Sequence, residues 1–208
     1  MLSEGRTGLI SAADGSINTL RVDKTGALVV VQGHPSYTEA AHRSKLFTVS
    51  TAVAGVAPGT ALSTTPPLAL LNPLNSGKNL SIITTSLGYV SGTLGAGTVV
   101  YAYVSPQATV PTGGTELTPV CAKLSTVRGT GRAFQGSTLS ATPLILEPVY
   151  ILGAFLATTA LVPGLLQDRV DGAYVVPEAT CFVVQGVTAA GSTPLVIMSI
   201  VWEEIDIV

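Results

Sequence analysis

The residues of this chain that could perform acid–base chemistry are few and scattered. Its two histidines, His34 and His42, lie close to Ser36, Glu39 and Ser44. A hydrolytic triad needs a nucleophile, a base and an orienting carboxylate that converge from separate segments, and no GxSxG elbow is present to hold a serine. We therefore predict no catalytic residues and regard the histidines as solvated or interface side chains.

Three further carboxylates, Glu116, Glu147 and Glu178, are the candidates for a glycan-active enzyme. Such an enzyme places two carboxyl groups across a cleft from each other. The spacing of these three residues brings no pair together, so this alternative of another class rests on residue type alone.

Two acidic groups could bind a hard cation with the help of loop oxygens. One contains Glu203, Glu204 and Asp206, and the other contains Asp168 and Asp171. The end of a strand and a polar turn explain these groups equally well. The two histidines and two cysteines form no cluster with the spacing of a zinc site. We expect neither a metal nor a cofactor.

The two cysteines, Cys121 and Cys181, sit in apolar, strand-like stretches without CxxC spacing. Two buried thiols are the favoured interpretation. A disulfide between them remains open at this stage, because sequence does not place their Cα atoms.

The glycine-rich stretches resemble phosphate loops only superficially. Gly77 and Lys78 are followed by an asparagine and a strand, whereas a P-loop needs Ser or Thr and then a helix. Gly92, Gly95 and Gly97 lie between two strand-like runs. They predict a hairpin turn.

Aromatic side chains offer one binding hypothesis. Tyr101, Tyr103 and Trp202 could form a platform on which a sugar ring stacks, as in a receptor-binding module. Alternation places both tyrosines on one face of a strand, where packing in a core serves equally well.

Along the chain, short runs rich in Val, Ile, Thr and Tyr alternate with clusters of Gly, Pro, Ser and Asn. This pattern predicts about ten strands joined by turns. The sequence is therefore all-β. The expected strands lie near Leu20, from Ala27, from Leu46, from Asn79, from Thr98, near Leu144, from Val149, from Ala173, from Thr180 and from Leu195 to the end.

A single helix is expected over residues 36–46, where Ser36 and Glu39 fit a capping box. Residues 1–45 hold nine of the 22 charged residues and both histidines. This shift predicts an N-terminal arm over residues 1–45, with a β-hairpin and the short helix, followed by a β-sandwich domain over residues 46–208.

The last strand carries a mixed pattern. Ile200, Trp202, Glu204 and Asp206 share one face, and apolar and acidic residues also mix on the other. A sheet with one face in water separates its faces cleanly, so this strand should be partly covered by a neighbour.

Charge is scarce, which limits the possible partners. Charged residues make up 11% of the chain and hydrophobic residues 47%, with a formal charge of -2. Because interface cores are depleted in charge, we expect other protein surfaces to cover much of this one. The scattered basic residues argue against nucleic-acid binding. No membrane partner is expected either, since the apolar residues 148–166 are interrupted by prolines and no apolar signal core follows the N-terminus.

The first 90 or so residues resemble virion proteins encoded among the structural genes of tailed bacteriophages. The similarity lies in the LRVD-x-x-G-x-L-x-V pattern from Leu20 to Val30, the His34 to Ala41 segment, Phe47, and the N-P-x-x-S-G-K-N-L turn from Asn72 to Leu80. The resemblance implies a jelly-roll-like antiparallel β-sandwich in a capsid decoration (cement) protein or a head–tail accessory protein.

We thus expect a non-enzymatic virion protein, assembled in the bacterial cytoplasm, that stabilises the head. It would form a closed oligomer, most simply a homotrimer, and bind between subunits of the major capsid protein through its arm. The alternative is a neck or tail accessory protein or a receptor-binding fibre-type protein.

Overall fold

The computed structural model describes residues 35–152 and 165–207. Contacts divide the chain into the units Met1–Thr38 and Glu39–Val208, and the second unit is the β domain described below. The helix and strands are α1 (Thr38–His42), β1 (Leu46–Ser50), β2 (Leu68–Asn72), β3 (Lys78–Thr93), β4 (Gly97–Val104), β5 (Thr115–Leu117), β6 (Val120–Cys121), β7 (Arg132–Gln135), β8 (Leu144–Leu152), β9 (Leu165–Arg169), β10 (Val175–Val176), β11 (Thr180–Thr188) and β12 (Ser192–Asp206).

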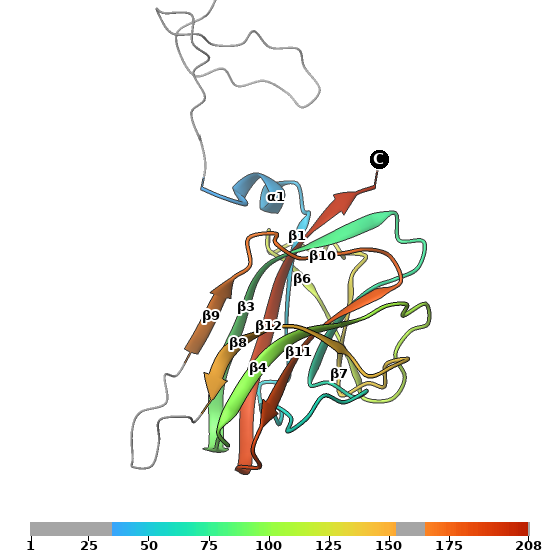
Figure 1. Cartoon of the computed structure of the whole chain (residues 1–208). Coiled ribbons are helices and arrows are strands. Elements are labelled where there is room, and N and C mark those ends of the chain that lie inside the picture. The colour runs from blue at the N-terminus through green and yellow to red at the C-terminus, as the bar shows by residue number, and fades with distance from the viewer. Residues whose placement is uncertain (1–34, 153–164, 208) are drawn as a thin grey trace, which may run out of the picture. The chain divides into compact units, whose positions relative to one another are not determined.

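The strands form two six-stranded sheets that pack face to face as a sandwich (Figure 1). The first sheet has the order β10-β3-β12-β1-β6, with β9 also paired to β3, and the second has the order β5-β7-β2-β11-β4-β8. Every pairing among the described strands is antiparallel. Four-strand runs β9-β3-β12-β1 and β8-β4-β11-β2 interleave along the chain as in a jelly roll. The predicted fold class is confirmed.

The main core lies between the sheets and centres on β12. Met198, Ile200 and Trp202 of this strand are fully buried, and the Trp202 ring stacks on Phe47 with centroids 6.0 Å apart. Glu204 lies on the same buried face, as the alternation predicts. Side chains of the second sheet, such as Leu70 and Phe182, cover this face, and β1 and β3 pair with the two edges of β12.

A second apolar cluster covers the outer face of the other sheet. Leu71 of β2 and Cys181 and Val183 of β11 pack there with Phe134 and Leu139. Because Leu68 and Leu70 of β2 and Phe182 and Val184 of β11 face the main core, both strands are buried on both sides. Two-sided burial explains why their sequences are continuously apolar instead of alternating.

The long connection between β4 and β8 extends both sheets. It supplies β5 and β7 at the edge of the second sheet and β6 at the edge of the first. Sequence analysis missed these strands, together with β2 and β9. The three strands of the insertion are only two to four residues long. The five residues of β2 were missed because prolines flank them, at positions 67 and 73.

The predicted helix was wrong in length. The helix α1 has only five residues, because Tyr37 adopts a left-handed φ of 66° and Ser44 a left-handed φ of 58°. Tyr37 thus separates Ser36 from the helix, so Ser36 does not act as its N-cap. The two strands expected near Leu144 and from Val149 form the single strand β8.

Several expectations fall on residues that the structure does not describe. The strands expected near Leu20 and from Ala27, and most of the predicted arm over residues 1–45, lie outside the described residues. No helix among residues 35–152 and 165–207 is both long enough and apolar enough to span a bilayer. The described part of the apolar stretch 148–166 belongs to β8 and β9.

The two cysteines are free and buried, as the favoured interpretation holds. Cys121 lies in the main core and Cys181 in the cluster on the outer face of the second sheet. A disulfide between them is therefore excluded. Burial raises the pKa of the Cys181 thiol.

Neutral amides and one carboxylate hold the loops that cover the sandwich. Gln185 accepts a hydrogen bond from Ser63 N at 3.4 Å and donates one to Ala61 O at 2.6 Å. Gln107 likewise donates to Thr109 O at 2.7 Å and accepts from Ser140 N at 2.7 Å. Such bonds satisfy loop backbone groups that burial would otherwise leave unpaired.

The buried carboxylate of Glu204 holds the loop before β7. Its Oε1 accepts hydrogen bonds from Thr130 N at 2.7 Å and Gly131 N at 2.8 Å. A Cβ atom at Gly129 would lie 2.6 Å from this oxygen, and one at Gly131 would lie 3.0 Å from Trp202 Nε1. A side chain at either position would thus crowd Glu204 or Trp202, and glycine lets the loop pass close to both.

We expect Glu204→Ala to lower the free energy of unfolding by about 2–4 kcal/mol, because two backbone N–H groups then lose their acceptor. Glu204→Gln, which keeps an acceptor oxygen, should recover part of this loss. Glu203→Ala on the outer face of β12 is the matched control and should change stability by about 0.5 kcal/mol or less. Urea unfolding measures all three variants, and equal losses at positions 203 and 204 would contradict the anchoring role.

Candidate functional site

The predicted catalytic candidates do not converge among the described residues. His42 lies exposed on α1, where Glu39 pairs with Arg43 at 2.6 Å. His34 lies outside the described residues. The two serines considered with them, Ser36 and Ser44, flank α1, and Ser36 is exposed.

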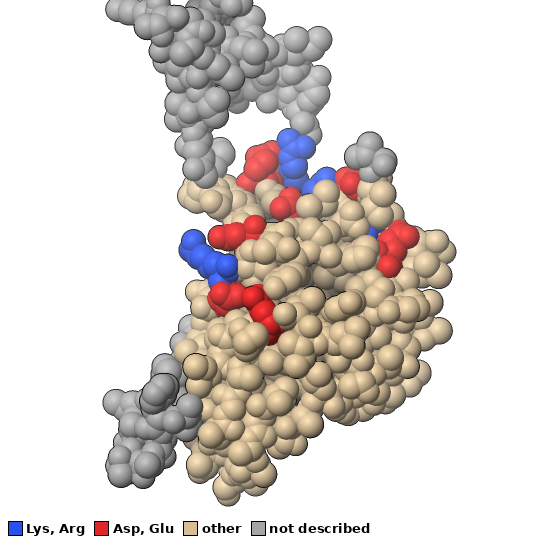
Figure 2. All heavy atoms as spheres, viewed as in Figure 1, with Lys and Arg blue, Asp and Glu red and all other residues tan. Residues whose placement is uncertain are grey.

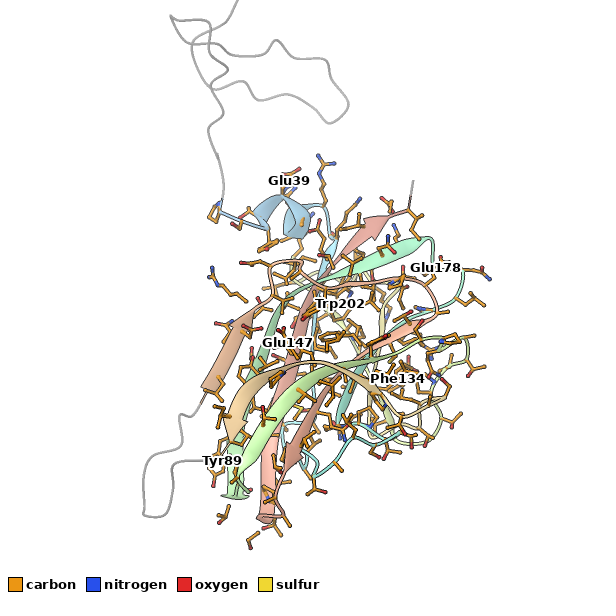
Figure 3. The ribbon with its side chains drawn as sticks, in the orientation of Figure 1. Glu39, Tyr89, Phe134, Glu147, Glu178 and Trp202 are labelled. Atoms are coloured by element: carbon orange, nitrogen blue, oxygen red, sulfur yellow. The ribbon has the colours of Figure 1, made fainter. Side chains whose placement is uncertain are left out.

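The three carboxylates considered for a glycan-active enzyme have separate partners. Glu116 binds Arg132 through two hydrogen bonds of 2.7 and 2.8 Å, and this contact lowers the pKa of Glu116. Glu178 accepts a hydrogen bond from Gly77 N at 2.6 Å. Glu147 lies on β8, apart from Glu178 (Figure 3). No pair of them faces each other across a cleft of the described domain.

The two proposed cation groups are also dispersed. Glu204 holds a loop in the core, whereas Asp206 binds Lys45 at 2.8 Å and also Lys78. The hydrogen bond from Lys45, with that from Lys78, lowers the pKa of Asp206 to about 2. Among the described residues, no three His, Cys, Asp or Glu side chains are grouped as metal ligands.

The predicted aromatic platform was wrong. Tyr101 and Trp202 are fully buried in the core, so neither ring can stack on a sugar. Tyr103 lines a small apolar pocket of about 250 Å³ between β8 and β10. Alternation on β4 did correctly place Tyr101 and Tyr103 on one strand face, and that face points inward.

A buried hydroxyl network, which sequence analysis missed, joins the two sheets near this pocket. Thr85 Oγ1 contacts both Tyr101 Oη and Tyr150 Oη, the latter at 2.9 Å. Tyr101 Oη donates to Asp168 Oδ2 at 2.9 Å, and Tyr150 Oη donates to Thr85 O at 3.0 Å. The four side chains come from four strands, and no sequence spacing links them.

Burial of the two phenols dominates the chemistry of this network. It raises the pKa of Tyr101 far above its usual range and also raises the pKa of Tyr150. Both groups therefore stay protonated at neutral pH and donate hydrogen bonds. These buried hydroxyls donate to Thr85 and to the Asp168 carboxylate, and the satisfied network stabilises the sandwich.

The most distinctive surface of the domain is one end of the sandwich without charge. Residues 46–77, 79–115 and 179–202 contain no Lys, Arg, Asp or Glu. Their loops meet where β3 turns into β4 and β11 turns into β12. On the face shown in Figure 2, the charged residues lie towards the opposite end, and this end shows none. We call it the uncharged end.

The two hairpins of the uncharged end touch through their backbones. Ala189 N donates to Ala96 O at 2.7 Å. A Cβ atom at Gly95 would lie 1.8 Å from Ala189 O, and one at Gly191 would lie 2.0 Å from Thr93 O. The predicted glycine turn is confirmed, and its glycines also allow the second hairpin to approach.

Apolar side chains and a groove are exposed at the uncharged end. Val53 is 87% exposed, and Tyr89 is partly exposed beside the β3–β4 turn (Figure 3). A groove of about 710 Å³ runs between residues 55–67 and the side chains of Gln135, Gln185 and Leu195. None of its lining residues is charged.

Comparison with known proteins adds little to this description. No protein-family model matches the sequence, and neither does any curated protein. A chain in a solved structure described as "KBV activated particle at acidic pH" has a TM-score of 0.23 and 10% identity, over 99% of this chain and 87% of that one. We draw nothing from a likeness of this size.

We expect the stability of the domain to fall as the pH rises above about 10, because the unfolded tyrosines ionise there while buried Tyr101 and Tyr150 keep their protons. Tyr101→Phe should cost about 1–2 kcal/mol at pH 8, since Asp168 and Thr85 lose a partner. The difference in the free energy of unfolding between Tyr101→Phe and the parent chain should shrink by about 1 kcal/mol between pH 10 and pH 11, because only the parent chain loses stability through Tyr101. Urea unfolding at these pH values measures it, and parallel pH profiles would contradict the assignment.

Proposed function

We propose that this protein is a structural subunit of a virus particle, most specifically a capsid decoration protein that binds between major capsid subunits. In this role it attaches by burying its uncharged end and forms a closed oligomer, most simply a trimer. No reaction is part of the proposal. The absence of charge at one end of the sandwich is the observation that carries it.

The physical argument concerns the cost of removing charge from water. A buried ion loses its hydration, and a partner must compensate with a well-placed opposite charge. The uncharged end carries no such cost, and its exposed Val53 and Tyr89 gain free energy when they are covered. Since ionic strength does not screen apolar burial, the contact would also be stable at different salt concentrations.

The rigidity of this end also favours a binding role. The close contact of Gly95 with Ala189 and of Gly191 with Thr93 fixes the two hairpins against each other. A surface that is already ordered loses less conformational entropy when it binds. Jelly rolls occur both in capsid proteins and in lectins, so the fold is compatible with either function. The support for the proposal comes from the uncharged end.

One observation favours a second candidate, a receptor-binding fibre-type protein or a neck or tail accessory protein. The groove beside the uncharged end offers hydroxyl groups, for example those of Thr60 and Ser63. Neutral hydroxyls suit the hydroxyls of a neutral sugar chain. Copy number separates the two candidates, because a decoration protein is present in hundreds of copies per particle and a fibre or neck protein in a small ring.

We expect Val53→Glu to abolish attachment to the particle, because it places a charge in the centre of the buried contact. Leu124→Glu is the matched control, since Leu124 is 88% exposed, Val53 is 87% exposed, and Leu124 follows Lys123 away from the uncharged end. Both changes should alter stability by about 0.5 kcal/mol or less.

Quantitative mass spectrometry of purified particles measures attachment for the parent chain and both variants. The proposal holds if Leu124→Glu is incorporated at the parent level and Val53→Glu is lost. It is overturned if the parent chain is absent from particles, or if both variants are incorporated equally.

A further inference from the structure

Strand β8 is an edge strand with an unusually apolar surface. It ends the second sheet beyond β4 and has no neighbour among the described strands on its other side. Leu144 is 63% exposed and Ile145 53%, and Leu146 is also exposed. Natural proteins protect free edges with charge or short strands, so an apolar edge of this kind is a site for another strand.

A pocket of about 250 Å³ lies beside this edge. Leu146 of β8 and Val175 of β10 flank it, and Tyr103, Tyr174 and Phe182 contribute to its wall. The volume is below the roughly 300 Å³ at which pockets for small-molecule ligands begin. It suits one aliphatic side chain.

The geometry of β8 connects the edge with the pocket. Its register with β4 shifts between Tyr101 and Ala102, so that Leu146 is the extra residue of a bulge. Bulges redirect side chains, and here Leu146 lines the pocket. A strand that paired with residues 144–147 would point alternate side chains towards the opening between the sheets.

Pro148 limits the length of such a pairing. Proline has no N–H group, and within sheets it is tolerated on edge strands. Each of residues 144–147 keeps its N–H. The free edge therefore accepts a short strand of about four residues, which matches strand addition by an extended peptide.

We propose that residues 27–32 of a second copy of this chain occupy the β8 edge and insert one aliphatic side chain into the pocket. This segment, Ala-Leu-Val-Val-Val-Gln, is uncharged and rich in β-branched residues, which favour strands. The described residues begin at 35, so the extended chain places residue 32 at most about 10 Å and residue 27 at most about 28 Å from that point. The segment can therefore reach the β8 edge of a copy that packs directly beside it.

Exchange of this kind is head-to-tail and closes into a ring when the rotation between copies allows it. The inference goes beyond the proposed function, since it concerns a different surface and holds whether or not the uncharged end binds a particle. It assigns the contact between copies to β8 and leaves the uncharged end for other proteins.

The test is disulfide trapping in the full-length chain. Val29→Cys with Ile145→Cys should form, under mild oxidation, a disulfide that joins residue 29 of one copy to residue 145 of another. A 1:1 mixture of ¹⁵N-labelled and unlabelled chains distinguishes the two cases, because only a link between copies yields mixed-label peptides in mass spectrometry. Val29→Cys with Val53→Cys is the control, since Val53 is the more exposed site. The yield at 145 should exceed the control on the order of ten-fold.

A second measurement needs no cysteine. Ile145→Asp with Leu146→Asp should shift the mass of the parent oligomer to that of the monomer in light scattering, while the circular dichroism of the β domain is unchanged. Links within one chain, a yield at 145 no higher than the control, or an oligomer that survives both aspartates would each overturn the proposal. Loss of particle attachment with the links intact would instead affect only the proposed function.

Discussion

The two-sided burial of β2 and β11 is the constraint on which most of this structure depends. A sheet that is apolar on its outer face must be covered, and the chain covers it with the insertion before β8 and with residues 51–67. Loops that lie on an apolar face carry backbone groups that water no longer reaches. Gln185 and Gln107 satisfy these groups with neutral amides, and Glu204 holds the loop that passes over Trp202. The covering loops are thus fixed parts of the fold.

Neutral side chains hold the covering loops, which explains why the fold needs few charged residues. A salt bridge would hold a loop equally well but would require two ions to lose water. With amides in that role, the charged residues can collect elsewhere, as in the cluster of Asp206 with Lys45 and Lys78. The uncharged end is the result of this separation. The few charged residues of the described domain therefore lie away from this end and are not spread evenly over the surface.

Local sequence predicted what alternation and turn chemistry encode. The all-β class, the strands β3, β4, β11 and β12, the turn at Gly92 to Gly97 and the inward face of Trp202 all follow from periods of two residues and from glycine. The strand β2 could not be predicted in this way, because two-sided burial removes the alternation and the prolines that flank the strand are typical of loops. The predicted start and length of the helix were wrong because Tyr37 adopts a left-handed φ, although the sequence around it fits a capping box. The hydroxyl network of Thr85, Tyr101, Tyr150 and Asp168 joins distant strands, so no sequence pattern signals it.

Two surfaces of this protein say most about its partners, and the fold is needed to recognise both. The low charge content and the strand expected at residues 27–32 come from the sequence. Only the fold shows that uncharged loops from three stretches meet at one end and that β8 is an edge strand among the described strands. These two surfaces differ physically. The uncharged end is broad and fixed by backbone contacts, which suits a preformed protein surface. The β8 edge is narrow, offers backbone hydrogen bonds and has a pocket for one side chain, which suits an extended segment. A subunit with both can bind its own copies through one and a larger assembly through the other, and neither contact requires a catalytic group.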